Sequence, residues 1–66
     1  MLIKMKIDKV FYERDIETVC ITTDVEEAIK VCKTINGDYN VSIWVNTFFL
    51  DSYMDIDEKG MRELFS

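Results

Sequence analysis

Histidine and proline are absent from this 66-residue chain, and glycine and cysteine each occur only twice. Without histidine there is no Ser-His or Cys-His pair for nucleophilic catalysis, and most zinc sites lose a nitrogen ligand. Gly37 and Gly60 are too far apart to form a glycine-rich phosphate loop. Asp55 and Asp57 begin like a calcium loop, but its twelfth position is Ser66 rather than glutamate. We therefore expect no enzymatic activity, no cofactor and no metal site.

The two cysteines, Cys20 and Cys32, are separated by eleven residues and form neither a CxxC pair nor a disulfide framework. Cys32 falls in an apolar helix stripe and is expected to be a small core residue, whereas Cys20 falls on a strand and is expected to be more exposed. The N-terminus alternates apolar residues with lysine, unlike a signal peptide, and no stretch approaches the roughly 20 apolar residues of a membrane span. We expect a reduced, cytoplasmic protein without membrane association.

Basic residues are scarce: 8 lysines and arginines stand against 13 acids, a formal net charge of −5. Nucleic-acid binding requires lysine and arginine to neutralise phosphates, so this composition argues against a direct nucleic-acid partner. The acids concentrate in residues 13–27 and 51–63, whereas residues 4–9 are net positive. This distribution is compatible with a basic protein partner, and also with mimicry of a nucleic acid.

The length allows a single small domain over residues 1–66, in which 1–54 form a sheet with a main helix and 55–66 form a short C-terminal helix. A chain of this size buries only about 60% of the surface that its unfolded form exposes. Such chains usually need a metal, disulfides, a partner subunit or very good packing. Homo-oligomerisation would supply the missing buried surface.

Hydrophobic periodicity predicts a β-hairpin and a helix in the first half of the chain. Residues 3–12 alternate apolar and polar side chains, residues 13–15 read as a polar turn, and residues 16–21 are rich in β-branched residues. The segment 22–37 has an apolar stripe at helical spacing and acids in its first turn. Its N-cap is expected at Thr22, Thr23 or Asp24, and Gly37 is its natural stop.

The second half predicts another hairpin, "VSIWVNTFFLDSY", turning at Asn46-Thr47. A regular register would place Val45 opposite Phe48, Ile43 opposite Leu50 and Val41 opposite Ser52, giving one apolar face that packs under the helix. The other face would hold Trp44 opposite Phe49 and Ser42 opposite Asp51, with Tyr53 at the strand end. The last residues, "DEKGMRELFS", predict a short amphipathic helix capped by Asp57, with Met61, Leu64 and Phe65 apolar.

The resulting order β-β-α-β-β-α predicts an α+β fold. One helix packs on one face of a four-stranded, mainly antiparallel sheet. The helix must return the chain so that the third strand lies antiparallel beside the first. This predicts the strand order 2-1-3-4, with the long first strand central.

The stretch "TTDVEEAIKVCKTINGDYNVSIWVN", set between two hairpins, resembles small uncharacterised β-β-α-β-β proteins of bacteriophages and low-GC Gram-positive bacteria. The shared pattern covers roughly residues 5–53: small hydroxyl residues lead into an EEAIK-like helix, then a GDY turn and a strand with a Trp. Asn46-Thr47 departs from the Asn-Gly that is frequent there. The resemblance implies a mobile-element origin, with action by blocking a host protein such as a defence factor or by sequestering a small molecule. It carries over no functional residues.

Three explanations compete for the aromatic face around Trp44 and Phe49. The C-terminal helix could fold back and cover it with Met61, Leu64 and Phe65. Two or more copies of the chain could pack these faces or edges together. The patch could instead be a recognition surface, because Trp and Tyr bury much area with few torsions.

The leading hypothesis is a non-enzymatic protein that inhibits or modulates a host protein through an aromatic sheet face and an acidic edge. Its expected partner-binding residues are Trp44, Phe49, Tyr53, Tyr12, Glu26 and Glu27. One alternative is an oligomeric binder of a nucleotide-like signal, whose phosphates would require Lys4, Lys6 or Arg14 around a shared pocket. Another is an acidic nucleic-acid mimic.

Overall fold

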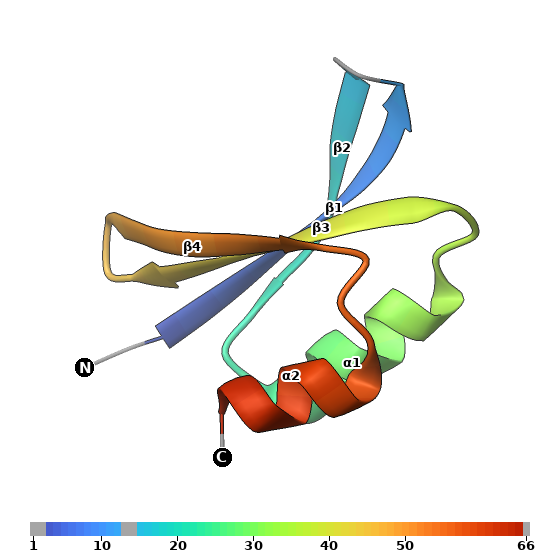
Figure 1. The fold of residues 1–66 in the computed structure, drawn as a ribbon. Coiled ribbons are helices and arrows are strands. Elements are labelled where there is room, and N and C mark those ends of the chain that lie inside the picture. Colours follow the sequence, from blue (N-terminus) through green and yellow to red (C-terminus); the bar gives the residue numbers. More distant parts are fainter. Residues whose placement is uncertain (1–2, 13–14, 66) are drawn as a thin grey trace.

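The structure, a computed structural model, describes residues 3–12 and 15–65 (Figure 1). Its elements are β1 (Ile3–Tyr12), β2 (Asp15–Thr22), α1 (Val25–Thr34), β3 (Asp38–Val45), β4 (Phe48–Met54) and α2 (Glu58–Leu64). The predicted α+β fold with a four-stranded antiparallel sheet is confirmed. Arg14, one of the candidate ligand-binding residues, lies outside the described residues.

The sheet has the order β2-β1-β3-β4, and every neighbouring pair is antiparallel. The predicted strand order is therefore confirmed, with β1 and β3 central. Met5 pairs with Ile43 and Ile7 pairs with Val41, so the apolar positions of both central strands fall on one face. Figure 1 shows the end of β1 and the start of β2 rising away from the side that carries the helices.

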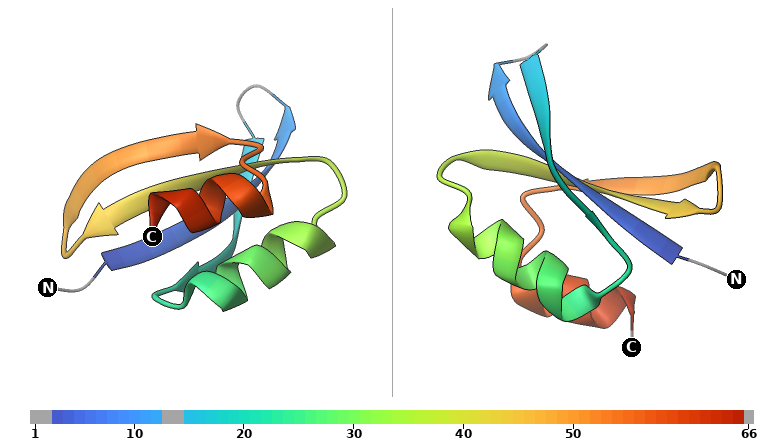
Figure 2. Two further views of the ribbon diagram at one scale, coloured as in Figure 1. Left: turned by 60° about the horizontal axis from the view of Figure 1, so that its bottom comes forward. Right: turned by 180° about the vertical axis from the view of Figure 1, so that it is seen from behind.

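Both helices lie on the same side of the sheet, as the two views of Figure 2 show. The buried core joins this sheet face to both of them: Met5, Ile7, Ala28, Ile29, Cys32, Val41, Ile43 and Met61. Cys32 is thus a core residue, as predicted. Because Met61 of α2 belongs to this cluster, α2 does not cover Trp44 and Phe49, and that explanation of the aromatic face is wrong.

The ends of α1 follow from local hydrogen bonding. Of the three candidate caps, Asp24 is the N-cap: its carboxylate accepts from the Glu26 backbone N–H at 2.9 Å. The Thr22 hydroxyl in turn accepts from the Asp24 N–H at 3.0 Å. The helix ends before the predicted stop at Gly37: Ile35 is the C-cap, and its backbone N–H donates to the Cys32 carbonyl at 3.2 Å. Gly37 lies in the following loop with a φ of 119°, a conformation that suits glycine because it has no Cβ.

The β3–β4 register departs from the prediction after its first two pairs. Val45–Phe48 and Trp44–Phe49 pair as expected, but a shift then places Ile43 opposite Asp51. Leu50 has no partner, as in a β-bulge, and the later residues of β4 change face relative to a regular ladder. The predicted Ile43–Leu50, Val41–Ser52 and Ser42–Asp51 pairs are therefore wrong.

The tip of this hairpin extends beyond the helices (Figure 1). Phe48 and Leu50, both predicted to pack under the main helix, are 72% and 58% exposed. That prediction is wrong because α1 is only 10 residues long and lies toward β1 and β2. Asn46 provides the positive φ of the turn, at 55°.

The loop before α2 is fixed to the start of β3. The backbone N–H of Asp55 donates to the Tyr39 carbonyl at 2.9 Å, and the Asp55 carboxylate accepts from the Tyr39 N–H at 3.0 Å. The Tyr39 hydroxyl also donates to the Ile56 carbonyl. Asp57 caps α2, as predicted, accepting from the Gly60 N–H at 2.8 Å. A Cβ on Gly60 would lie 2.8 Å from the Ile56 side chain, so a larger residue there would force Ile56 to shift.

Candidate functional site: the open face of the sheet

The face of the sheet opposite the helices, which we call the open face, carries the aromatic residues predicted to bind a partner. Trp44 pairs with Lys4 on β1 and with Phe49 on β4, so these three side chains share the open face. Lys6 lies on the same face, opposite Ser42 of β3 and Ile21 of β2. The open face therefore combines aromatic, aliphatic and basic side chains from all four strands.

Trp44 and Phe49 form a defined aromatic pair at the β3–β4 end of the open face. Their ring centroids are 5.5 Å apart and their planes meet at 70°, an edge-to-face arrangement. Such pairs add about 0.5–1.5 kcal/mol beyond the burial of their area. Phe49 nevertheless stays 54% exposed, while Trp44 is half-buried. The pair is thus held in place but remains accessible.

A shallow hollow of about 200 Å³ lies beside this pair, lined by Lys4, Lys6, Ile21 and Trp44. Lys4 and Lys6 were predicted as ligand-binding residues and Trp44 as a partner-binding residue, and the structure places all three around this hollow. Ile21 was not among the predicted site residues. It reaches the open face because β2 has a register shift, in which Val19 is left without a partner between the Cys20–Ile7 and Thr18–Asp8 pairs.

The same bulge corrects the placement of Cys20, which an unbroken alternation puts on the open face. Cys20 instead pairs with Ile7 and packs partly against the core on the helix side. Its thiol donates to the Glu27 carboxylate at 3.7 Å. Burial, followed by the Glu27 charge, raises the pKa of the Cys20 thiol and so disfavours the nucleophilic thiolate.

The indole Nε1 of Trp44 is buried and has no hydrogen-bond partner in the part of the chain that the structure describes. A buried donor without an acceptor costs about 1–3 kcal/mol, and native structures contain few of them. This atom lies on a residue that lines the hollow, next to two side chains that carry positive charge. Trp44 therefore carries an unmet hydrogen-bonding capacity.

The remaining predicted partner-binding residues lie elsewhere. Glu26 and Glu27 are on α1, and α1 lies on the side of the sheet opposite the open face (Figure 2). Tyr53 pairs with Val41 on the helix side, where it is half-buried and its hydroxyl donates to Asp51 at 3.2 Å. Tyr12 is 78% exposed at the end of β1. The structure does not bring the predicted aromatic face and acidic edge onto one surface, because the sheet lies between the open face and the acids of α1.

Glu26 takes part in an ion-pair network that connects the two helices. Both Arg62 guanidinium NH groups donate to its carboxylate, at 2.5 and 3.0 Å, and the Arg62 Nε donates to Glu58 at 3.1 Å. Lys33 of α1 also pairs with Glu58. The hydrogen bond from Arg62 holds the pKa of Glu26 below its ordinary value, and those from Lys33 and Arg62 do the same for Glu58. The carboxylates raise the pKa of Arg62 in return.

Stability is expected to depend on pH through this network. A carboxyl group whose pKa is lower in the folded state stabilises the fold above its unfolded pKa, and that contribution is lost as the pH falls through the folded pKa. The loss for Glu26 and Glu58 therefore begins near 4.5, their ordinary pKa, and continues below it. Arg62→Gln should reduce the difference in unfolding free energy between about pH 7 and about pH 3, measured by urea denaturation. Lys59→Gln is the control, and an equal reduction by both variants would contradict this assignment.

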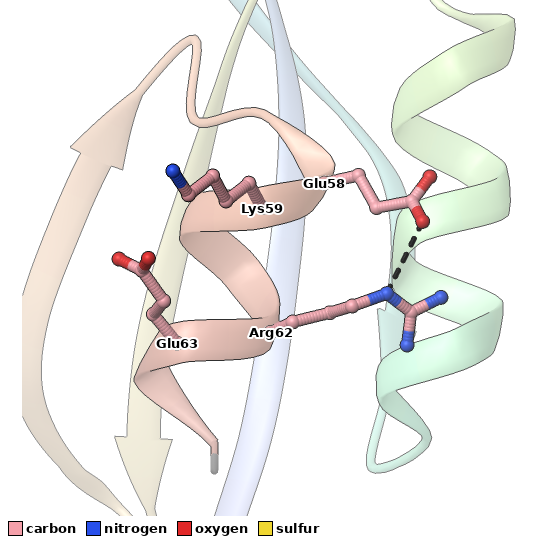
Figure 3. A pocket seen from close by; sticks show the side chains of 4 residues that line it. All are labelled: Glu58, Lys59, Arg62 and Glu63. Carbon is pink, nitrogen blue, oxygen red and sulfur yellow. Dashed lines mark hydrogen bonds and ion pairs between the residues drawn. The ribbon is translucent and has the colours of Figure 1, made fainter.

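Two other hollows are poorer candidates. One lies over α2 and is lined by Glu58, Lys59, Arg62 and Glu63, which Figure 3 shows projecting from this one helix. It is lined by two carboxylates and two basic side chains, so it has no excess of positive or negative charge to attract a charged ligand. The other, about 310 Å³ between the helices, includes Cys32 and Met61. Burial raises the pKa of Cys32 to about 11, which keeps its thiol protonated near neutral pH.

Within residues 3–12 and 15–65, no group of three or more His, Cys, Asp or Glu side chains is placed to hold a metal ion. In the same described residues, no helix has both the length and the apolar character needed to cross a membrane. The sequence matches no model of a known protein family, and no characterised protein or solved structure is significantly similar to it. The open face must therefore be interpreted from its own chemistry.

Proposed function

We propose that this chain is a non-enzymatic binding protein that recognises another protein through the open face of its sheet. The observation that carries the proposal is the accessible Trp44–Phe49 pair beside the hollow at Lys4 and Lys6. Exposed aromatic residues on a rigid scaffold are typical of binding hot spots, because they bury large areas at low entropic cost. The resemblance to phage proteins makes a bacterial host protein, inhibited or modulated in the cytoplasm, the partner that we expect.

The acidic residues of α1 have no part in this proposal. Glu26 is engaged by Arg62, and Glu27 accepts a hydrogen bond from Cys20. Other acids also act within the fold: Asp24 and Asp57 cap the two helices. These local roles give no support to a nucleic-acid mimic, whose charges would have to be free and regularly spaced on one surface.

Two neighbouring phenylalanines allow a matched test of the open face. Phe49 is on the open face, whereas Phe48 is on the helix side, and both are largely exposed. Phe49→Ala is expected to reduce capture of the partner from bacterial lysate by at least about tenfold, measured by quantitative mass spectrometry of tagged protein. Phe48→Ala should leave capture within about twofold of the unmodified chain.

Two outcomes of this experiment would contradict the proposal. If Phe48→Ala and Phe49→Ala reduce capture of the same protein to the same extent, the open face is not the binding surface. If neither change has an effect, partner binding through these aromatic residues is excluded. Circular dichroism of both variants establishes that the fold is retained.

A second candidate is a binder of a small anionic ligand, favoured by the presence of Lys4 and Lys6 in the same hollow. Ligand pockets generally enclose about 300–1,000 Å³, so a hollow of about 200 Å³ would need a second copy of the chain to enclose a nucleotide-like molecule. Native mass spectrometry of protein purified from host lysate tests this candidate. A dimer carrying a ligand supports it, whereas a ligand-free monomer at low salt contradicts it.

A further inference from the structure

The hollow on the open face is a basic site on an acidic protein. The chain has a net charge of −5, yet Lys4 and Lys6 stand on the same side of β1 and line the hollow together. Among residues 3–12 and 15–65, neither lysine has an ion-pair partner. Elsewhere Lys33 and Arg62 are paired with carboxylates. The two free ammonium groups therefore create a local attraction for an anion.

The hydrogen-bonding and apolar features of the hollow narrow the choice of anion. Trp44 contributes a buried indole N–H without an acceptor, and Ile21, which is 59% exposed, contributes an aliphatic wall. The N–H is covered in the free protein, so binding of an acceptor to it requires a covering side chain to move. A carboxylate oxygen is a strong acceptor for such a donor.

We propose that the hollow binds the side-chain carboxylate of an aspartate or glutamate in an acidic segment of the partner, with separate apolar residues of that segment on Ile21 and on Phe49, which lie on the two edge strands. This inference rests on the proposed function and specifies the partner's chemistry. Lys4 and Lys6 attract the carboxylate by charge, and the Trp44 N–H orients it by a hydrogen bond. The exposed apolar side chains contribute buried apolar area.

The rest of the open face favours a single carboxylate over a polyanion. Asp8 and Asp38 lie further along the same face, opposite Asn40 and Val10. Asp8 is buried and accepts a hydrogen bond of 2.7 Å from Thr18. A nucleic acid running across the face would place its phosphates near these acids, whereas one carboxylate at the lysine end avoids them.

The test uses the fact that Trp44 is the only tryptophan, so the indole N–H gives a single NMR resonance. Two mixed hexapeptide libraries, acetylated and amidated, serve as probes. One contains Asp, Glu, Leu and Phe at every position, and the other replaces the acids by Asn and Gln. The acidic library is expected to shift the Trp44 indole resonance saturably, with at least about tenfold higher apparent affinity than the amide library.

A matched pair of double variants examines the charges. Lys4→Gln with Lys6→Gln should weaken binding of the acidic library by about tenfold or more, while Lys30→Gln with Lys59→Gln, on the two helices, should change it less than about twofold. Equal binding of the two libraries, no shift with either, or equal effects of the two double variants would overturn the carboxylate assignment. Binding of an oligonucleotide in place of the peptides would also overturn it.

The capture experiment separates failure of this inference from failure of the proposed function. If the partner is lost with Phe49→Ala but retained with the Lys4 and Lys6 double variant, the open face binds a protein without using a carboxylate. If the partner is captured as well with Phe49→Ala and with the Lys4 and Lys6 double variant as with the unmodified chain, the proposed function itself fails.

Discussion

Replacing Met61 by alanine is expected to lower the free energy of unfolding by about 2–5 kcal/mol, the range found for large-to-small changes in a core. Met61 is fully buried and is the residue of α2 that belongs to the core. It lies next to Cys32, whose thiol is 4.0 Å from the Met61 sulfur. A small domain has about 5–15 kcal/mol of total stability, so the change would remove a large share of it.

The physical reason lies in the length of α2, which has only seven residues. An isolated helix of that length is not stable in water, so α2 forms because it is packed against α1 and the sheet. Chemical denaturation followed by circular dichroism measures the effect. Met54→Ala, at a position 58% exposed on β4, is the control and should change stability by about 0.5 kcal/mol or less. A similar small loss for Met61→Ala would show that α2 contributes little to the fold.

Trp44→Phe is expected to separate stability from binding. The phenyl ring retains most of the aromatic contact with Phe49 but removes the N–H that has no acceptor in the described structure. Removing an unsatisfied buried donor costs nothing in hydrogen bonding, so the unfolding free energy should stay within about 1 kcal/mol of its original value or rise. Partner affinity should fall by about tenfold to a hundredfold, because a hydrogen bond to a charged acceptor is lost.

Stability is measured by denaturation, and affinity by titration of the captured partner. Tyr12→Phe is a suitable control, because Tyr12 is an exposed aromatic residue at the far end of β1 and should change neither quantity. If Trp44→Phe weakens folding and binding together, Trp44 has a structural role. If it changes neither, the indole N–H is not used for recognition.

The sequence was sufficient for the fold wherever a signal repeats along an element. Alternation identified β1, the apolar stripe identified α1, and Asp57 marked the start of α2. The strand order followed from the path that α1 imposes on the chain. These signals are local or geometric, so they can be read from the sequence without knowledge of tertiary contacts.

The errors about which face a strand residue occupies come from two β-bulges, which have no reliable signature in a single sequence. The bulge at Val19 turned Cys20 toward the core and Ile21 onto the open face, and the bulge at Leu50 placed Tyr53 on the helix side. One extra residue reverses every later side chain in a strand, so a correct strand can still give a wrong face.

The candidate site was predicted in part. Trp44 and Phe49 were placed together correctly because their pair lies between the turn and the bulge at Leu50. Lys4 and Lys6 were recognised as basic candidates, but their position beside Trp44 depends on the register between β1 and β3. The sequence also separates Glu26 from Arg62 by 36 positions, so their ion pair could not be inferred from spacing.

The bulge at Leu50 also bears on polymerisation. β4 is an edge strand with exposed Phe48, Phe49 and Leu50, and a straight apolar edge of this kind is a template for fibril growth. The unpaired residue interrupts the regular spacing of N–H and carbonyl groups along that edge, and Asp51 follows it with a charge. Extension of the sheet by another chain here would bury that charge and require a strand that matches the irregular ladder. The local defect thus opposes edge-to-edge association of an exposed apolar strand.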